Sequence, residues 1–258
     1  MSAPGVLVHR DPALLARAVA ARLVTRLVDV QAGRGHASVV LTGGGIGTDT
    51  LAAVAANPAR DAVDWPRLDV WWGDERYLPA GDANRNETQA RAALLDDVDV
   101  DPARVHPMRA AVPGVEPEEA AARYAEELAA AAGPEDHGPV PAFDVLLLGV
   151  GPDGHVASLF PEQPALHETE RTVVAVRGAP KPPPVRLTLT LPAIRAAREV
   201  WVVVAGADKA RAVRLALAGA GPMQVPAAAA RGRSRTLWLV DRAAAAAVPP
   251  ELARIASP

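Results

Sequence analysis

The sequence predicts an α/β fold with three layers, in which a mostly parallel, twisted sheet carries helices on both faces. Short runs of branched and aromatic residues recur along the 258 residues, and helical stretches lie between several of them. Such alternation is typical of a parallel sheet covered on both sides, a Rossmann-like arrangement. The run 143–148 is rich in Val and Leu and bounded by Pro and Gly, as expected of a central strand.

The first predicted helix starts at Asp11 and Pro12, which have the order expected of an N-cap and a first turn. Apolar residues follow at every fourth position, and Gly33 and Gly35 are expected to end the helix. A surface helix is predicted over 117–132, because two glutamates open it and a Gly-Pro pair follows it. The predicted strands are 39–41, 68–72, 143–148, 200–204 and 236–240.

A single domain covering 1–258 is predicted. The length allows one or two domains. The Pro- and Gly-rich segments 133–141 and 178–184 are short enough to be loops within one domain rather than linkers between two.

Composition excludes several classes of function. The net charge of −3 with 22% charged residues gives no general basic field, so neither nucleic acid nor a membrane surface is an expected partner. No apolar run reaches the roughly 18 residues of a membrane span, and the N-terminus lacks the pattern of a signal peptide, so a cytoplasmic location is expected. The absence of cysteine excludes disulfides, thiolate zinc ligands and cysteine nucleophiles. No obligate protein partner is evident.

Glycines after the strand 39–41 form a candidate phosphate site. Gly43, Gly44 and Gly45 stand between that strand and a helix-like stretch, where backbone N–H groups can point at one anion beside a helix N-terminus. The alternative is a tight turn without a ligand. The lysine of a nucleotide-binding P-loop is missing, so a nucleoside triphosphate is not expected.

A glycine-rich turn after the strand 143–148 places His155 beside Asp153 and suits acid/base chemistry. Ligands of open α/β sheets bind at the carboxyl ends of strands, which is where this turn lies. The turn also satisfies GxGxxG, but Asp153 would put a carboxylate where a pyrophosphate should sit. No acid-terminated strand follows about 20 residues later, so neither a dinucleotide nor another cofactor is predicted.

Charged residues follow other strands at the same predicted edge. Asp74 and Arg76 come after the strand 68–72, and Lys209 comes after 200–204. Arg186 opens the segment RLTLT, and Lys181 in the proline loop is a weaker candidate. A guanidinium suits phosphate, whereas a carboxylate can accept from sugar hydroxyls or orient a histidine. The five other histidines have no motif context and no zinc spacing, so no metal site is predicted; they are His9, His36, His106, His137 and His167.

Four blocks in a fixed order resemble the 6-phosphogluconolactonases. These are TGGGIG at 42–47, WGDERYLPAGDANRN at 72–86, GPDGHVASLFP at 151–161 and RLTLTLPAI at 186–194. The resemblance spans about 38–240. It implies hydrolysis of 6-phospho-D-glucono-1,5-lactone to 6-phosphogluconate in the pentose phosphate pathway. Where many family members have Ser, Thr and Pro, this loop has Gly45, Ile46 and Gly47, and backbone donors are expected to compensate for a lost hydroxyl.

Lactone hydrolysis needs a base for water and an acid for the departing ring oxygen, and one imidazole can serve as both. We expect His155 to do so, with either Asp153 or Asp74 holding its tautomer. The glycine loop, Arg76, Arg186 and Lys209 are expected to bind the phosphate and ring. The lactone is the expected small-molecule partner.

Two alternatives are a glucosamine-6-phosphate deaminase and a non-enzymatic sugar-phosphate effector domain. The deaminases have a similar turn, but they resemble GHIAFNE, with a glutamate where this chain has Phe160, and they usually carry a tyrosine where it has Arg76. An effector domain of a regulator needs a DNA-binding module. The roughly 35 residues before the strand that leads into the glycine loop predict one helix, which is too little for a helix-turn-helix.

Overall fold

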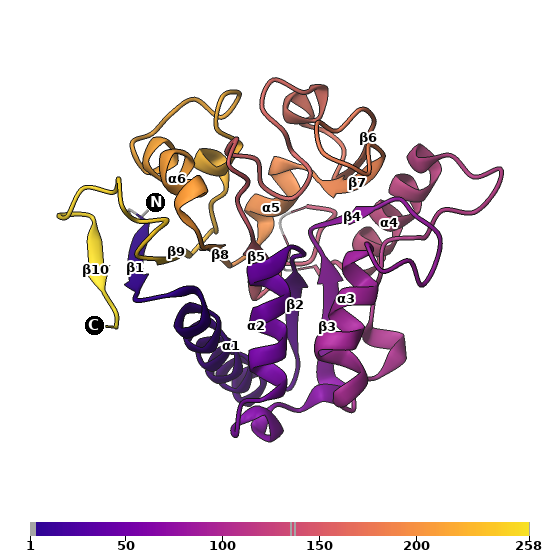
Figure 1. Cartoon of the computed structure of the whole chain (residues 1–258). Helices are drawn as coiled ribbons and strands as arrows, with labels where there is room; N and C mark the ends of the chain where they lie inside the picture. Colours follow the sequence, from indigo (N-terminus) through magenta and orange to yellow (C-terminus); the bar gives the residue numbers. More distant parts are fainter. Residues whose placement is uncertain (1–3, 135, 137, 258) are drawn as a thin grey trace.

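The computed structural model describes residues 4–134, 136 and 138–257. Its central element is a seven-stranded sheet with the strand order β10-β1-β9-β8-β5-β2-β3 (Figure 1). Every neighbouring pair in this sheet is parallel. The strands are β1 (Gly5–His9), β2 (Ala37–Leu41), β3 (Leu68–Trp72), β5 (Val145–Leu148), β8 (Glu199–Val204), β9 (Arg235–Asp241) and β10 (Ala253–Ile255).

Helices cover both faces of this sheet. In Figure 1 one group of helices lies in front of the strands: α1 (Pro12–Arg34), α2 (Gly45–Ala55) and α3 (Asn86–Ala93). The other helices are α4 (Pro117–Ala131), α5 (Leu191–Ala196) and α6 (Ala210–Leu217). Short 3-10 helices occupy Arg60–Ala62, Trp65–Arg67, Leu95–Asp97, Pro102–Arg104, Pro164–His167, Ala207–Lys209 and Pro226–Ala229. The predicted fold class is confirmed, and the five predicted strands correspond to β2, β3, β5, β8 and β9.

Two apolar clusters form the core, one on each face. In β2, Val39 and Leu41 pack with the α1 and α2 side, whereas Val40 packs with α4, α5 and α6. This division follows from the pleat, because successive side chains of a strand point to opposite faces. A strand buried on both faces therefore needs apolar residues at both kinds of position, and this explains the run in β5.

The first helix begins as the sequence predicts and ends slightly later. The side chain of Asp11 accepts a hydrogen bond from the backbone N–H of Leu14 at 2.8 Å. The helix continues through Gly33 and stops at Gly35, which has φ of 79° and donates to Gln31 O. Gly35 is the residue that ends the helix because the left-handed conformation at this cap carries little penalty for glycine.

A second, smaller sheet was missed by the sequence analysis. It is antiparallel, has the order β4-β7-β6, and consists of β4 (Asp74–Arg76), β7 (Arg186–Leu189) and β6 (Val173–Val176). It lies near the carboxyl ends of the central strands, at the upper right of Figure 1. Its register pairs Arg76 with Arg186, and so brings two predicted site segments side by side.

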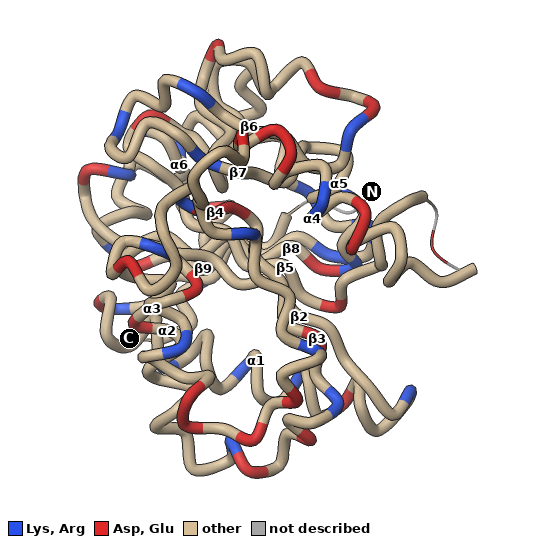
Figure 2. Tube along the Cα trace, turned by 90° about the vertical axis from the view of Figure 1, so that its right-hand side faces the viewer, with Lys and Arg blue, Asp and Glu red and all other residues tan. Residues whose placement is uncertain are grey.

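Acidic and basic residues are interspersed along the chain trace in the view of Figure 2. In the described part of the chain, no helix is both long enough and apolar enough to traverse a bilayer.

Candidate active site

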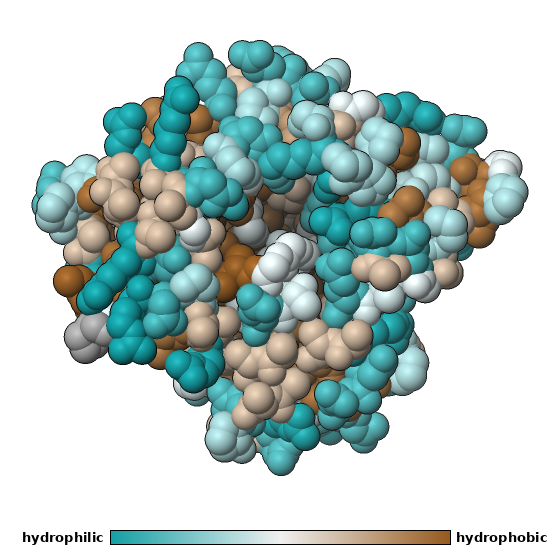
Figure 3. All heavy atoms as spheres, viewed as in Figure 1, coloured by the Kyte–Doolittle hydropathy of each residue, from teal (hydrophilic) through white to brown (hydrophobic). Residues whose placement is uncertain are grey.

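A cavity of about 430 Å³ opens at the carboxyl ends of β2, β5 and β8. In the space-filling view it appears as a hollow near the centre of the molecule, beside the N-terminal end of α2 (Figure 3). Three predicted segments, after β2, after β5 and in β4, meet here. The predicted site residues that line the cavity are Gly43, Gly44, Gly45, Asp74, Arg76, His155, Arg186 and Lys209.

The glycine loop forms one wall and leads into α2. Gly44 is the residue before the helix and has φ of 82°, a conformation that disfavours a side chain. A Cβ on Gly43 would lie 1.9 Å from Asn86 Oδ1, whereas a Cβ on Gly45 would meet nothing within 4 Å. Gly47 is also constrained, because its Cβ would lie 2.7 Å from Thr42 O. The loop therefore brings bare backbone and the positive end of α2 to the cavity.

His155 is held by the turn that follows β5. The backbone N–H of Gly151 donates to His155 O at 3.0 Å, and that of Gly154 donates to Gly151 O at 2.9 Å. A Cβ on Gly151 would lie 2.1 Å from the imidazole, so only glycine leaves room for the ring. Imidazole Nδ1 lies 2.5 Å from Asp153 Oδ1. The other ring nitrogen, Nε2, is thereby left for chemistry in the cavity.

The neighbours of Asp153 stabilise its ionised form. Burial alone would raise the pKa of Asp153, but the hydrogen bond from His155 and the charges of His155 and Lys181 lower it to about 2. A lowered pKa means that ionised Asp153 stabilises the fold above the ordinary carboxyl range. This contribution is lost as the pH falls through about 2.

Asp74 is placed differently. It is buried, and its Oδ2 accepts from Ser158 Oγ at 2.6 Å. The side-chain amide of Asn86 donates to the Asp74 backbone O at 2.8 Å. Of the two carboxylates considered from the sequence, Asp153 contacts His155, and Asp74 instead ties β4 to the turn after β5.

The middle residue of the Asp-Glu-Arg triplet has a structural role that sequence reasoning missed. Glu75 is fully buried, and its carboxylate accepts from the backbone N–H groups of Arg76, Asn86 and Glu87 at 2.7 to 2.9 Å. The last two groups open α3, so Glu75 serves as its cap. Arg85 Nη2 lies 3.6 Å from Glu75 Oε2 and 3.0 Å from Glu87 Oε2.

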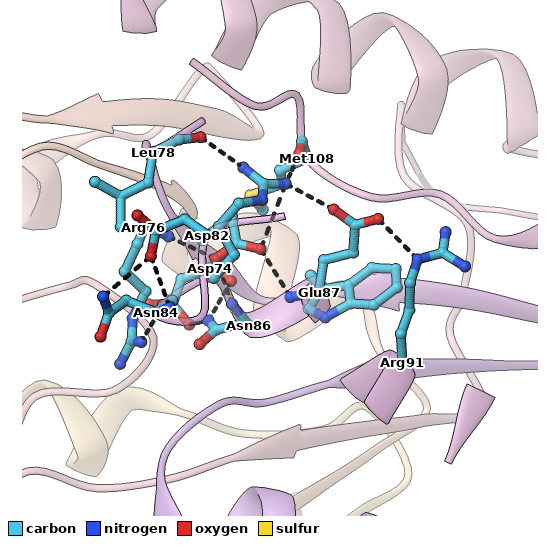
Figure 4. Close-up of polar contacts among 12 residues, drawn as sticks. Asp74, Arg76, Leu78, Asp82, Asn84, Asn86, Glu87, Arg91 and Met108 are labelled. Carbon is cyan, nitrogen blue, oxygen red and sulfur yellow. Dashed lines mark hydrogen bonds and ion pairs between the residues drawn. The ribbon is translucent and has the colours of Figure 1, made fainter. Parts of the chain in front are cut away.

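This network joins β4 to α3, and Figure 4 shows it around Asp74, Asn86 and Glu87, with Arg91 at its outer end. Burial raises the pKa of Glu75, while Arg85 and the three backbone donors oppose that shift.

Four basic side chains line the cavity, and they differ in how many hydrogen-bond donors remain free to bind a ligand. They are Arg76, Lys181, Arg186 and Lys209. Arg76 Nη1 donates to Asn84 O at 2.6 Å, and Lys209 is paired with the exposed Asp208. Arg186 is 5% exposed and uses Nε and Nη2 on the backbone oxygens of its own loop, but its Nη1 bonds to no described residue. Lys181, judged weaker from the sequence, lines the cavity as well.

The remaining histidines are not part of this site. His9, His36, His106 and His167 do not line the cavity, and His137 lies outside the described residues. Among residues 4–134, 136 and 138–257, no group of three or more His, Asp or Glu could hold a metal ion.

Comparisons with known proteins agree on one family. A family model described as glucosamine-6-phosphate isomerases/6-phosphogluconolactonase matches residues 10–238. A curated 6-phosphogluconolactonase of Streptomyces coelicolor is 65% identical over 251 residues, covering 96% of this chain and 96% of the relative. A 6-phosphogluconolactonase of Mycobacterium tuberculosis is 50% identical over 241 residues, covering 93% of this chain and 96% of the relative.

Solved structures of similar shape come from both branches of this family. A 6-phosphogluconolactonase from Trypanosoma brucei superposes with a TM-score of 0.83 at 30% identity, covering 95% of this chain and 99% of that one. A monomeric glucosamine-6-phosphate deaminase superposes with a TM-score of 0.76 at 20% identity, covering 93% of this chain and 99% of that one. The second likeness concerns the fold alone.

Proposed function

The chain belongs to the glucosamine-6-phosphate isomerase/6-phosphogluconolactonase family, and from that premise we propose that it hydrolyses 6-phospho-D-glucono-1,5-lactone to 6-phosphogluconate. Relatives at 65% and 50% identity are 6-phosphogluconolactonases, so the enzyme is a carboxylic ester hydrolase. The observation that supports the mechanism best is His155, which lines the cavity beside the glycine loop and whose Nδ1 contacts Asp153 Oδ1 behind it at 2.5 Å. A cytoplasmic location stays a prediction.

In the proposed mechanism His155 activates water. Nε2 takes a proton from a water molecule as the water oxygen bonds to the lactone carbonyl carbon, and a tetrahedral oxyanion forms. The oxyanion then collapses, the bond from that carbon to the ring oxygen breaks, and the imidazolium returns the proton to the ring oxygen. Asp153 receives Nδ1–H throughout, which fixes the tautomer and stabilises the imidazolium while it exists.

The phosphate is proposed to bind where backbone donors and cations face each other. The first turn of α2 offers N–H groups at the glycine loop, and Arg76 and Lys209 line the same cavity. Arg186 contributes through Nη1, because its other donors are already used. A phosphate dianion would compete with Asp208 for Lys209, and this exchange costs little at an exposed ion pair.

Deamination of glucosamine 6-phosphate is the less favoured function. Within the described chain, the acids that line the cavity are Asp49 and Asp74, and no glutamate is among them. The position where deaminases carry their glutamate is occupied by Phe160, whose ring centroid is 4.5 Å from that of His155. An apolar ring beside the imidazole supplies no second proton-transfer group.

Phosphate recognition gives the test of this proposal. The wild-type enzyme should prefer 6-phosphogluconolactone over unphosphorylated gluconolactone in kcat/KM. Changing Arg76 to Ala should weaken apparent affinity for the phosphorylated lactone by about tenfold to a hundredfold, since a hydrogen bond to a charged group is worth roughly 1.5 to 3 kcal/mol. The defect should shrink for the unphosphorylated substrate.

The matched control is Arg17→Ala, which removes an exposed arginine of α1 that does not line the cavity. It should leave both substrates unaffected. Equal losses on both lactones with Arg76→Ala would instead assign Arg76 to structure or to the chemical step. Absence of any preference in the wild type would refute phosphate recognition at this loop.

A further inference from the structure

The chain contains two lysines, Lys181 and Lys209, and both line the candidate active site. Their surroundings differ. Lys209 pairs with exposed Asp208, whereas Lys181 Nζ lies 3.7 Å from Asp153 Oδ1. That oxygen is the one that His155 Nδ1 contacts at 2.5 Å. A cation and an imidazole therefore meet on the same carboxylate oxygen.

Hydrogen bonds from the side chain of Arg186 hold the backbone around Lys181. Arg186 Nε donates to Pro183 O at 3.1 Å, and its Nη2 donates to the carbonyl oxygens of Lys181 and Pro182, each at 3.2 Å. The Arg186 guanidinium is buried and stands over the ring of Phe160, with 5.6 Å between its Cζ and the ring centroid. The same ring packs against His155. Arg186 thus links the loop of Lys181 to the turn after β5, which carries His155.

The side chains of Lys181 and Asp153 are only partly buried. Lys181 is 43% exposed and Asp153 is 31% exposed, so water competes for both. The backbone N–H of His155 also donates to Asp153 Oδ1, at 3.4 Å, and Lys181 adds a charged partner from outside the turn that further restricts rotation of this carboxylate.

We propose that Lys181 is a positioning residue, which holds Asp153 in the orientation that fixes His155, and that Arg186 holds the Lys181 loop in place. The consequence for catalysis rests on the proposed lactonase function. The ion pair itself does not, and can be tested separately.

Kinetics of Lys181→Met, Lys181→Arg and Lys209→Met separate positioning from phosphate binding. For Lys181→Met we expect kcat to fall about two- to fivefold on both lactones, as suits a half-exposed ion pair, with KM nearly unchanged. Lys181→Arg, which keeps the positive charge, should recover most of the lost kcat. Lys209→Met should instead raise KM for the phosphorylated lactone alone. If Lys181→Met raises only that KM and leaves kcat unchanged, Lys181 is a phosphate ligand and the proposal is wrong.

A second measurement needs no turnover. Reductive ¹³C-methylation keeps the lysine charge and gives the intact chain dimethylamine NMR signals from Lys181, Lys209 and the N-terminal amine. Asp153→Asn should shift the signal of Lys181 but not that of Lys209. An unchanged Lys181 signal would overturn the ion pair. A chain that shows this shift but no lactone hydrolysis would instead contradict the proposed function.

Discussion

Replacing His155 by Asn is expected to lower turnover of the phosphorylated lactone by roughly 10² to 10⁴. Asn is polar and fits the space of the ring, but it cannot take a proton from water or return one to the ring oxygen. The contact with Asp153 would lose its charge-stabilising role at the same time. The measurement is steady-state kcat at neutral pH, corrected for spontaneous lactone opening, on protein shown by circular dichroism to be folded.

The control is His106→Asn. His106 stacks on Trp71 with 3.8 Å between ring centroids and does not line the candidate active site. If only the imidazole of His155 takes part in proton transfer, replacing His106 should leave kcat within about twofold of wild type. Near-normal turnover by a folded His155→Asn variant would remove His155 from the proton-transfer role.

Changing Glu75 to Gln is expected to lower the free energy of unfolding by about 3 kcal/mol, at the lower end of the range for breaking a buried ion pair. The neutral amide keeps the size of the side chain. It leaves Arg85, which is 1% exposed, with Glu87 as its remaining acidic partner. It also turns an acceptor of three backbone N–H groups into a group that is itself partly a donor. The measurement is urea unfolding at neutral pH.

Glu118→Gln provides the contrast. Glu118 is exposed on α4 and pairs with the exposed Arg177 at 2.8 Å, so its loss should cost less than about 1 kcal/mol. Equal stability of Glu75→Gln and wild type would show that the backbone donors, rather than the charge, hold α3. Because Glu75 fixes the start of α3, where Asn86 contacts Asp74, we also expect reduced turnover in Glu75→Gln.

The sequence predicted the elements whose signals are local. The predicted central strands are runs of mostly buried apolar residues, and Asp11 with Pro12 marks the start of α1 through contacts within four residues. The small sheet escaped detection because β4, β6 and β7 are three to four residues long, too short to show a period. β1 and β10 lie at one end of the sheet order and were also missed. β10 has only three residues, whereas β1 has five, as many as β2 and β3, and begins at a glycine.

At the site, the sequence identified groups that stand in compact motifs. It placed Asp153 two residues from His155, and that neighbour contacts the imidazole. It did not identify Glu75 as a cap or Lys181 as a partner of Asp153, because these contacts join segments 11 to 28 residues apart. Asn86, which contacts Asp74, was also not identified as part of the site. Its position inside the block 72–86, next to Arg85, was the only feature of the sequence that could have indicated a role.

In the proposed mechanism an imidazole, rather than a metal ion, activates water for attack on the lactone. The most direct test is the rate of 6-phosphogluconolactone hydrolysis by protein treated with EDTA, with ammonia release from glucosamine 6-phosphate measured in parallel. We expect the treated enzyme to retain full lactonase activity, to gain nothing from added zinc, and to release no ammonia. Activity that EDTA abolishes and zinc restores would contradict this mechanism and would make His155 a metal ligand.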